Sequence, residues 1–155
     1  TALHPMADLT TEPRWARMNG TFGEDAKLSA KLIAAYILGF QGDSLNPQSV
    51  ACMTKHWPGG GPLEKGEDSH FQYGKNQVYP GKNFNYFQIP FEAAFKAKTA
   101  MIMPYYSVPF EQTSENVGMS FNKEIITDLL RKKYSYDGIV CTDWMILEGF
   151  SILGY

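Results

Sequence analysis

The sequence predicts an α/β fold with a parallel sheet. Four short strand-like runs alternate with three helical segments along the 155 residues, in the order β-α-β-α-β-α-β. Such an alternation is typical of parallel strands joined by right-handed crossovers. Four strands are about half of a (β/α)8 barrel, which takes about 250 residues. The pattern alone therefore predicts either part of a TIM (β/α)8 barrel or an open doubly wound sheet.

The first strand and the first helix are expected near the N-terminus. Residues 2–9 have the character of a short strand, with Asp8 near its end. Asp25 is a good N-cap for the helix that follows. Apolar side chains then recur at a spacing of four, as in a helix, at Leu28, Leu32, Tyr36 and Phe40. Gly42 is the expected stop at the C-terminal end of this helix.

The middle of the chain holds two further strands and a long loop. Residues 49–54 form the second expected strand, which ends in Lys55 and His56. The loop from residue 57 to about residue 89 is long enough to indicate a functional role, and its aromatic residues favour an ordered structure. We expect a short helix over residues 90–98, with Pro90 in its first turn. The third strand is expected over residues 99–103.

The last helix and strand lead to a carboxylate. The helix is expected over residues 122–132, with a buried face made of Ile125, Ile126, Leu129 and Leu130. Residues 139–142 form the fourth strand, and their continuous apolar character predicts burial on both faces. Asp143 follows directly, at the position where parallel α/β folds place catalytic groups. An Asp in this position also commonly caps a following helix.

Composition and charge exclude several classes of protein. Hydrophobic residues make up 44% of the chain, and the net charge of −2 gives no basis for binding nucleic acid. No apolar run reaches the roughly 20 residues of a membrane span. Cys52 and Cys141 lie in apolar runs that are typical of buried thiols. We expect no metal, because the histidines lack helical His-x-x-x-His spacing, and no cofactor, because no Gly-x-Gly-x-x-Gly follows the first strand.

Each expected strand ends in side chains that suit a sugar site. The C-terminal ends of parallel strands share one face of the fold. Polar side chains at these ends therefore predict a polar pocket on that face. The side chains at the four ends are Asp8, Lys55 with His56, Tyr106, and Asp143 with Trp144. Charged groups and imidazoles bind sugar hydroxyls, and aromatic rings stack on a pyranose. Retaining glycoside hydrolysis needs one carboxylate nucleophile and a proton donor about 5–5.5 Å away.

Several motifs along the chain carry a family resemblance. Residues 136–144 (YDGIVCTDW) resemble the nucleophile segment of glycoside hydrolase family 3, and residues 55–61 (KHWPGGG) resemble its KH(F/W)PG-x-G segment. Residues 13–17 (PRWAR) with FGED are similar to the family's PRWGR…FGED, although Ala16 replaces the usual Gly, and residues 103–106 (MPYY) are similar to its MPxY. The motifs occur in the family's order along nearly the whole chain. The resemblance implies a β-glucosidase-like N-terminal (β/α)8 barrel domain.

The resemblance also implies roles for individual residues. It implies Asp143 as the nucleophile in a retaining double displacement that hydrolyses terminal non-reducing β-D-glucosyl residues. The implied lining of the subsite for the non-reducing sugar is Arg17, Lys55, His56, Met103, Tyr106 and Trp144. The implied substrate is a β-glucoside or an oligosaccharide.

The acid/base residue has two possible sources within this family. In its β-glucosidases the residue is a Glu from a second, C-terminal domain. In its β-N-acetylhexosaminidases it is an Asp/His pair on the loop after the KH segment, where this chain has Asp68 and His70. Gly60 stands where that subgroup has His, and this favours the β-glucosidase interpretation. A β-N-acetylhexosaminidase that uses Asp68 and His70, and a non-catalytic carbohydrate-binding protein, are the alternatives.

The resemblance predicts an incomplete barrel. Residues 1–155 are expected to be a portion of a single N-terminal barrel domain, with the C-terminal domain absent. Half a barrel exposes sheet edges and apolar faces that normally need a partner. We therefore expect the rest of the barrel, and a C-terminal domain or another chain that supplies the acid/base, to complete the site. We expect the isolated chain to be inactive, and we expect neither nucleic acid nor a membrane as a partner.

Overall fold

A parallel sheet forms the centre of the molecule. The computed structural model describes residues 1–146. In this part of the chain β1 (Met53–Trp57), β3 (Met101–Pro104) and β5 (Ile139–Val140) form a three-stranded sheet in the order β1-β3-β5. Both pairs of neighbouring strands are parallel. The alternating α/β pattern and the parallel sheet predicted from the sequence are therefore confirmed.

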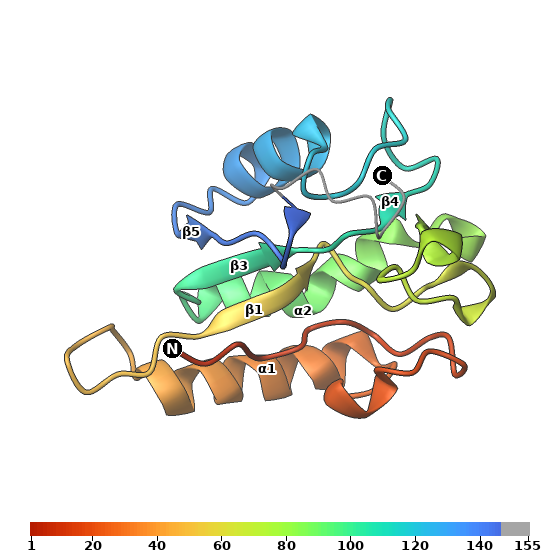
Figure 1. Cartoon of the computed structure of the whole chain (residues 1–155). Helices are drawn as coiled ribbons and strands as arrows, with labels where there is room; N and C mark the ends of the chain where they lie inside the picture. Colours follow the sequence, from red (N-terminus) through yellow and green to blue (C-terminus); the bar gives the residue numbers. More distant parts are fainter. Residues whose placement is uncertain (147–155) are drawn as a thin grey trace.

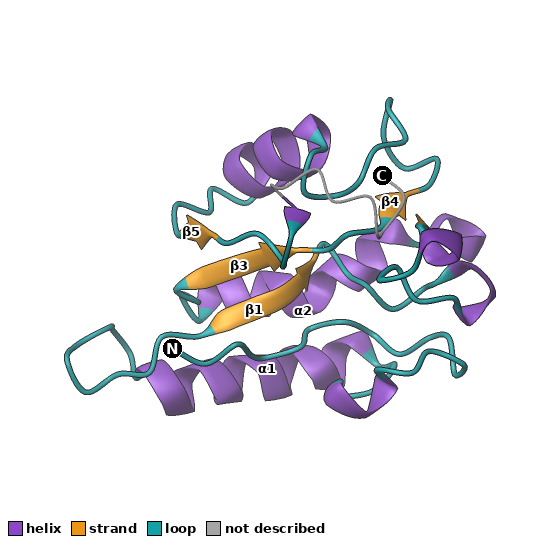
Figure 2. Cartoon of the chain, viewed as in Figure 1, coloured by secondary structure: helices purple, strands orange, loops and turns teal. Residues whose placement is uncertain are grey.

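Three helices connect and cover the strands. Helix α1 (Ala26–Gln41) lies along the N-terminal segment, α2 (Phe84–Lys96) lies behind β1 and β3, and the π-helical segment η5 (Glu124–Lys133) precedes β5 (Figure 1). Loops make up most of the structure beyond the carboxyl ends of β1 and β3 (Figure 2). Among residues 1–146, no helix is long and apolar enough to cross a membrane.

Short elements order the loops at the carboxyl ends of the strands. Strand β2 (Asn76–Gln77) pairs in parallel with β4 (Val108–Pro109). Single-turn 3-10 helices occur at Met18–Gly20, Glu64–Gly66, Gln72–Gly74 and Pro80–Lys82. The long loop predicted between residues 57 and 89 is thus ordered, and it ends at residue 83, just before α2 begins at Phe84.

The N-terminal segment and β1 differ from the predicted strands. Residues 2–9 extend beside β1 and form only isolated parallel bridges, Ala2 with Cys52 just before β1 and Met6 with Lys55 inside it. The second strand begins at Met53 and not at residue 49. The reason is that backbone groups of residues 49–51 form hydrogen bonds outside the sheet. For example, the Val50 N–H donates to the Phe40 carbonyl at the end of α1, 2.9 Å away. Lys55 and His56 consequently lie inside β1.

Helix α2 begins six residues before its predicted start. It runs from Phe84 to Lys96, and Pro90 lies in its interior. Proline removes one helical hydrogen bond and is normally unfavourable there. Phe87 and Phe91 lie on either side of it and are 1% and 0% exposed. Burial of these two rings on one face of the helix outweighs the local preference of proline.

Helix α1 forms where it was predicted, but it buries a different face. The Asp25 carboxylate accepts the Leu28 N–H at 2.8 Å, and Gly42 follows the helix with a φ of 72°. The apolar residues spaced by four are largely exposed, since Leu28 is 52% and Phe40 42% exposed. The buried side chains of α1 are those of Ala26, Ser29, Ile33, Ile37 and Gln41. The apolar repeat indicates the helix correctly, but it does not face the core of this chain.

The predicted burial of the fourth strand on both faces is wrong. Strand β5 contains only two residues, and Ile139 is 62% exposed. The reason is that β5 pairs with β3 on one side and is the edge of the described sheet. Cys141, which follows β5, is only half-buried, whereas Cys52 is buried as predicted, and both thiols are free. Burial raises the pKa of the Cys52 thiol.

The main core lies between β1 and the two following helices. Trp57 is fully buried, and its ring makes edge contacts with Phe91 at 5.3 Å and Tyr134 at 5.7 Å between ring centroids. Its indole Nε1–H donates to the Ile125 carbonyl, 3.2 Å away. From η5, Ile125 and Leu130 are buried and Ile126 and Leu129 partly buried, so the predicted apolar face of this helix is confirmed. This core fixes β1, and therefore Lys55 and His56, against α2 and η5.

Gln41 joins the end of α1 to the start of two strands. Its side chain is 3% exposed. The amide oxygen accepts the Cys52 and Ala100 N–H groups, each at 2.9 Å. The amide nitrogen donates to the Lys98 carbonyl at 2.9 Å. One side chain therefore forms hydrogen bonds with three backbone groups. A buried backbone N–H or carbonyl without a hydrogen-bond partner would destabilise the fold.

The variant Gln41→Met tests this contact. Methionine has a similar length but cannot pair with the two N–H groups or the carbonyl, so we expect the free energy of unfolding to fall by about 3 kcal/mol. Urea denaturation of the protein measures this change. Gln48→Met, at an exposed position of the same region, is the control and should stay within about 0.5 kcal/mol of wild type. Equal losses in the two variants would contradict the role of Gln41.

Candidate active site

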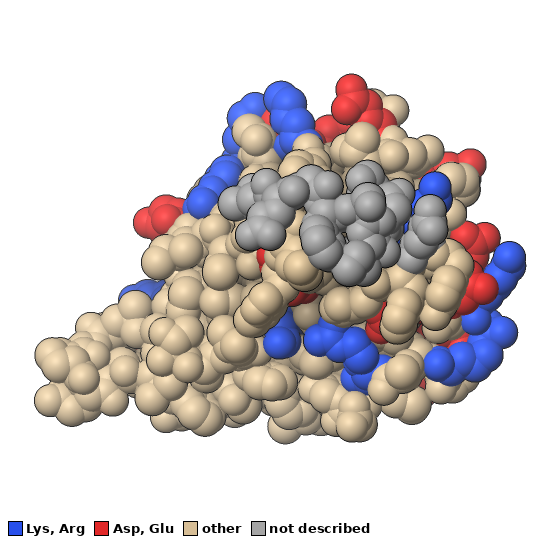
Figure 3. Space-filling view, in the orientation of Figure 1, with Lys and Arg blue, Asp and Glu red and all other residues tan. Residues whose placement is uncertain are grey.

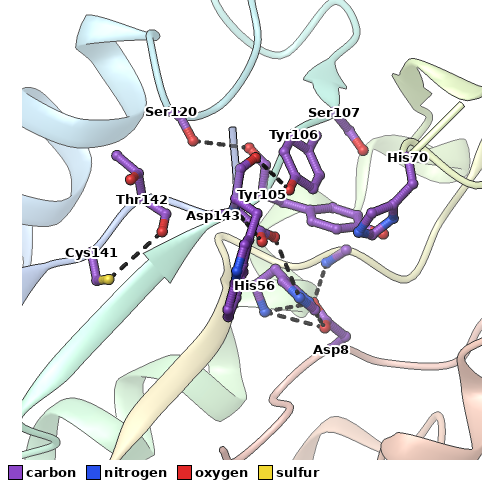
Figure 4. A network of polar contacts seen from close by, with 12 residues as sticks. Asp8, His56, His70, Tyr105, Tyr106, Ser107, Ser120, Cys141, Thr142 and Asp143 are labelled. Atoms are coloured by element: carbon purple, nitrogen blue, oxygen red, sulfur yellow. Dashed lines mark hydrogen bonds and ion pairs between the residues drawn. The ribbon is translucent and has the colours of Figure 1, made fainter. Parts of the chain in front are cut away.

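Four segments far apart in the sequence bring polar side chains to one edge of the sheet. Asp8 lies near the end of the extended N-terminal segment, His56 lies near the end of β1, Tyr106 follows β3 and Asp143 follows β5. Figure 4 shows these side chains close together, with the His56 ring between Asp8 and Asp143. Parallel pairing produces this arrangement, because all the strands point their carboxyl ends in the same direction.

Asp8 and His56 form a buried pair. They are 0% and 1% exposed. The His56 backbone N–H lies 3.0 Å from Oδ1 and 3.1 Å from Oδ2 of Asp8, and His56 Nδ1 lies 2.7 Å from Oδ2. The Gly60 N–H also donates to Oδ1. Burial lowers the pKa of His56, and the Asp8 carboxylate opposes this only in part. His56 is therefore neutral near pH 7.

Asp143 faces the other edge of the His56 ring. It is 6% exposed, and its Oδ1 accepts the Trp144 backbone N–H at 2.8 Å. Its Oδ2 lies 3.9 Å from His56 Nε2, which is longer than a hydrogen bond. The alternative role of Asp143, as the cap of a following helix, depends on residues outside the described part of the chain.

Two cationic side chains lie near these carboxylates. Lys55 is 9% exposed, and burial together with Arg17 lowers the pKa of its ammonium group, while Asp143 and Asp8 oppose this shift. Arg17 Nη1 is buried and has no hydrogen-bond partner within residues 1–146. In the space-filling view of Figure 3, blue basic and red acidic residues lie close together near the middle of the visible face of the molecule. A buried, unpaired guanidinium nitrogen is costly, so a polar ligand group would be favoured beside it.

Tyr106, Met103 and Trp144 are also found at this edge. The Tyr106 hydroxyl donates to the Trp144 carbonyl at 2.8 Å. Burial and the nearby Asp143 raise the pKa of Tyr106, so its phenol stays protonated. Met103 is 1% exposed, whereas the Trp144 ring is 60% exposed. A pocket of about 410 Å³ opens here, and Met53, Met103, Asp143 and Trp144 are among the residues that line it.

Asp68 and His70 form a second pair on the loop after β1. Asp68 Oδ1 accepts the His70 backbone N–H at 2.9 Å and lies 2.5 Å from His70 Nδ1. Its Oδ2 accepts the Trp15 indole N–H at 2.9 Å. Burial raises the pKa of Asp68, but the hydrogen bonds from His70 and Trp15 outweigh it and lower the pKa to about 2. The His70 ring is 4.8 Å from the ring of Tyr106, so this pair borders the main cluster.

Two residues support the site in ways that the sequence does not predict. Asp8 was expected in the polar pocket at the strand ends, but no pattern in the sequence indicates that it bonds to His56. Gln77 is fully buried, and its Nε2 donates to the Gly60 carbonyl at 2.9 Å and to Ser107 Oγ at 3.0 Å. It lies in the predicted loop, where no periodicity distinguishes it. Within residues 1–146, no group of three or more His, Cys, Asp or Glu is placed to hold a metal ion.

Comparison with known proteins gives a consistent family match. The model of the family described as "Glycosyl hydrolase family 3 N terminal domain" matches residues 1–155. Beta-glucosidase C of Emericella nidulans is 60% identical over 147 residues, which are 94% of this chain and 24% of that protein. The periplasmic beta-glucosidase/beta-xylosidase of Dickeya chrysanthemi is 45% identical over 94% of this chain and 23% of its own length. The chain thus spans about a quarter of the length of these relatives.

A solved structure has the same fold. A mutant beta-glucosidase from Listeria innocua in complex with laminaribiose superimposes with a TM-score of 0.81 and 26% identity. The match covers 98% of this chain and 20% of that chain. The described architecture therefore corresponds to part of a (β/α)8 barrel, and the open-sheet alternative is not supported.

The variant Asp68→Asn tests the Asp68–His70 pair. A carboxyl group with a pKa of about 2 when folded and about 3.9 when unfolded stabilises the fold above roughly pH 4. This contribution is lost as the pH falls through the folded value. We therefore expect the variant to be less stable than wild type at pH 7 and the difference to shrink towards pH 2.

Urea denaturation of the full-length gene product at pH 7, 5 and 3 measures this difference. Asp43→Asn, at an exposed position, is the control and should stay within about 0.5 kcal/mol of wild type. A difference between wild type and Asp68→Asn that is the same at every pH would contradict the stabilising role of the ionised pair.

Proposed function

Because the chain belongs to the family of glycosyl hydrolase family 3 N-terminal domains, we propose that it provides the sugar-binding half of a β-glucosidase active site. The proposed reaction is hydrolysis of terminal non-reducing β-D-glucosyl residues with retention of configuration. The observation that carries this proposal is the buried Asp143 carboxylate beside His56 and Lys55. The 60% identity to a beta-glucosidase supports the same substrate class.

Asp143 is proposed as the nucleophile. One carboxylate oxygen attacks the anomeric carbon while the bond to the leaving oxygen breaks, and an acid delivers a proton to that oxygen. The residue that acted as the acid then acts as a base and deprotonates a water molecule, which attacks the anomeric carbon of the glycosyl ester and frees Asp143. Each step inverts the configuration of the anomeric carbon, so the two steps together retain it. The hydrogen bond from the Trp144 N–H orients the carboxylate.

The groups around Asp143 are proposed to bind the non-reducing sugar. Arg17 and Lys55 would donate hydrogen bonds to its hydroxyl groups, and the unpaired Arg17 Nη1 supports this role. The exposed Trp144 ring offers a surface for stacking against a pyranose, and Met103 lines the same pocket. Tyr106, whose phenol stays protonated, contributes a hydroxyl group beside Asp143.

A β-N-acetylhexosaminidase is the second candidate, because Asp68 and His70 form a hydrogen-bonded pair near Tyr106. Gly60 argues against it. A Cβ atom at Gly60 would lie 2.9 Å from Asp8 Oδ1 and 2.9 Å from the Tyr105 ring, so the His of that subgroup does not fit here. Asp68 has a pKa of about 2 and is ionised, so in this second candidate the proton would have to come from His70. We therefore favour a Glu from a C-terminal domain as the acid/base.

We also propose that residues 1–155 are a portion of a barrel domain and are inactive alone. The chain spans 24% of its relative from Emericella nidulans, and the exposed Ile139 at the edge of the sheet is suited to a further strand. An assay of the isolated 155-residue chain with 4-nitrophenyl β-D-glucopyranoside should give no turnover. Turnover at a rate comparable with that of the full-length gene product would refute this proposal.

The variant Asp143→Asn tests the nucleophile. Asparagine keeps the shape of the side chain but cannot form the glycosyl ester, so we expect kcat for the aryl glucoside to fall by about 10⁴-fold or more. Calorimetry with a non-hydrolysable β-thioglucoside should show that binding is largely retained. Both measurements use the full-length gene product.

Asp137→Asn is the matched control for this experiment. Asp137 lies six residues earlier in the same segment and is exposed, so its variant should keep wild-type kcat. If Asp143→Asn also kept the wild-type rate, the assignment of the nucleophile would be wrong. If wild-type protein bound the thioglucoside but hydrolysed none of the glucosides offered, a non-catalytic carbohydrate-binding function would replace the proposed one.

A further inference from the structure

We propose that Asp8 is a positioning residue that fixes the proton of His56 on Nδ1, so that Nε2 presents a lone pair to the space beside Asp143. The inference rests on the proposed function, because that space is the proposed site of the reacting sugar. Asp8 itself does not reach this space, since its carboxylate lies on the opposite edge of the His56 ring (Figure 4).

The contacts of Asp8 leave it only one role towards the imidazole. Its carboxylate is fully buried and accepts the backbone N–H groups of His56 and Gly60. Its Oδ2 also lies 2.7 Å from His56 Nδ1. An ionised carboxylate has no proton to donate. The proton in the contact at 2.7 Å therefore belongs to His56 Nδ1.

A neutral imidazole carries only this one proton. His56 is buried, and burial lowers its pKa, as does Arg17, while Asp8 and Asp143 oppose the shift. With the proton on Nδ1, the opposite nitrogen Nε2 is a hydrogen-bond acceptor. The fixed carboxylate on one side of the ring thus determines the chemistry of the nitrogen on the other side.

The distance between Nε2 and Asp143 agrees with this tautomer. Two acceptors face each other at 3.9 Å, without a hydrogen bond between them. A sugar hydroxyl placed beside both can donate to Nε2, and Asp143 then keeps its lone pairs for attack on the anomeric carbon. The other tautomer would point an N–H at Asp143, and a hydrogen bond from it would reduce the nucleophilicity of the carboxylate.

The imidazole is also held against rotation. The Tyr105 ring lies 4.4 Å from the His56 ring between centroids. Gly60, whose N–H donates to Asp8, has no room for a side chain because a Cβ would lie 2.9 Å from Asp8 Oδ1. The loop after β1 therefore packs tightly against Asp8 and His56. With the orientation of the ring fixed, the contact with Asp8 determines which tautomer His56 adopts.

The variant Asp8→Asn tests this role. Asparagine can accept hydrogen bonds on only one of its two terminal atoms. The backbone N–H groups of His56 and Gly60 cannot change, so its oxygen is expected to face them and its NH₂ group to face Nδ1. The imidazole can respond by moving its proton to Nε2, as happens when the Asp of a Ser-His-Asp triad is replaced by Asn.

The primary measurement is the ¹⁵N NMR spectrum of histidine-labelled, full-length gene product. For wild type we expect the assigned His56 signals to show a protonated Nδ1 and an unprotonated Nε2, and for Asp8→Asn the reverse. We expect kcat/KM for the aryl glucoside to fall by about 100-fold in the variant. Asp25→Asn, which replaces one good helix N-cap with another, is the control and should change neither the tautomer nor the rate.

The outcomes separate this inference from the proposed function. A wild-type His56 with its proton on Nε2, or the same tautomer in wild type and Asp8→Asn, would overturn the role of Asp8. The wild-type spectrum decides this even if Asp8→Asn does not fold. If Asp143→Asn keeps full activity, the proposed function fails, and the tautomer comparison still tests Asp8. A change of tautomer in Asp8→Asn together with the loss of rate supports both.

Discussion

The parallel alignment of the N-terminal segment, β1, β3 and β5 is the constraint on which the rest of the structure depends. Because all four run in the same direction, Asp8, His56, Tyr106 and Asp143 reach the same edge of the sheet. The helices maintain this alignment from outside, through the core around Trp57. A change in the register of one strand would move its terminal residue away from the others, since successive residues point to opposite faces.

Charge balance is the second requirement at this edge. Two buried carboxylates, Asp8 and Asp143, lie on either side of the His56 ring, and burial of a charge is unfavourable unless polar partners compensate it. Asp8 is compensated by N–H donors of the protein, whereas Asp143 has one backbone donor and the nearby cation Lys55. This difference suits the proposed division of roles: Asp8 is fully engaged and positions His56, and Asp143 remains able to react.

The fold class and the identity of the residues at the strand ends could be predicted from the sequence, because both follow from local patterns and motifs. The start of α2 could not, since burial of Phe87 and Phe91 outweighs the local preference of Pro90. The exposure of Ile139 follows from the position of β5 at the sheet edge, which its apolar sequence does not reveal. The contacts of Asp8 and Gln77 depend on residues about 50 and 30 positions away, so only the folded structure shows them.

Covalent trapping tests the central claim, that Asp143 forms a glycosyl ester, most directly. The full-length gene product, with its fold confirmed by near-UV circular dichroism, is incubated with an activated 2-deoxy-2-fluoro-β-glucoside, digested and examined by mass spectrometry. The account predicts one added 2-deoxy-2-fluoroglucosyl group on the peptide that contains Asp143, and no adduct in Asp143→Asn. An adduct on a different carboxylate, or turnover of the reagent without any adduct, would contradict it.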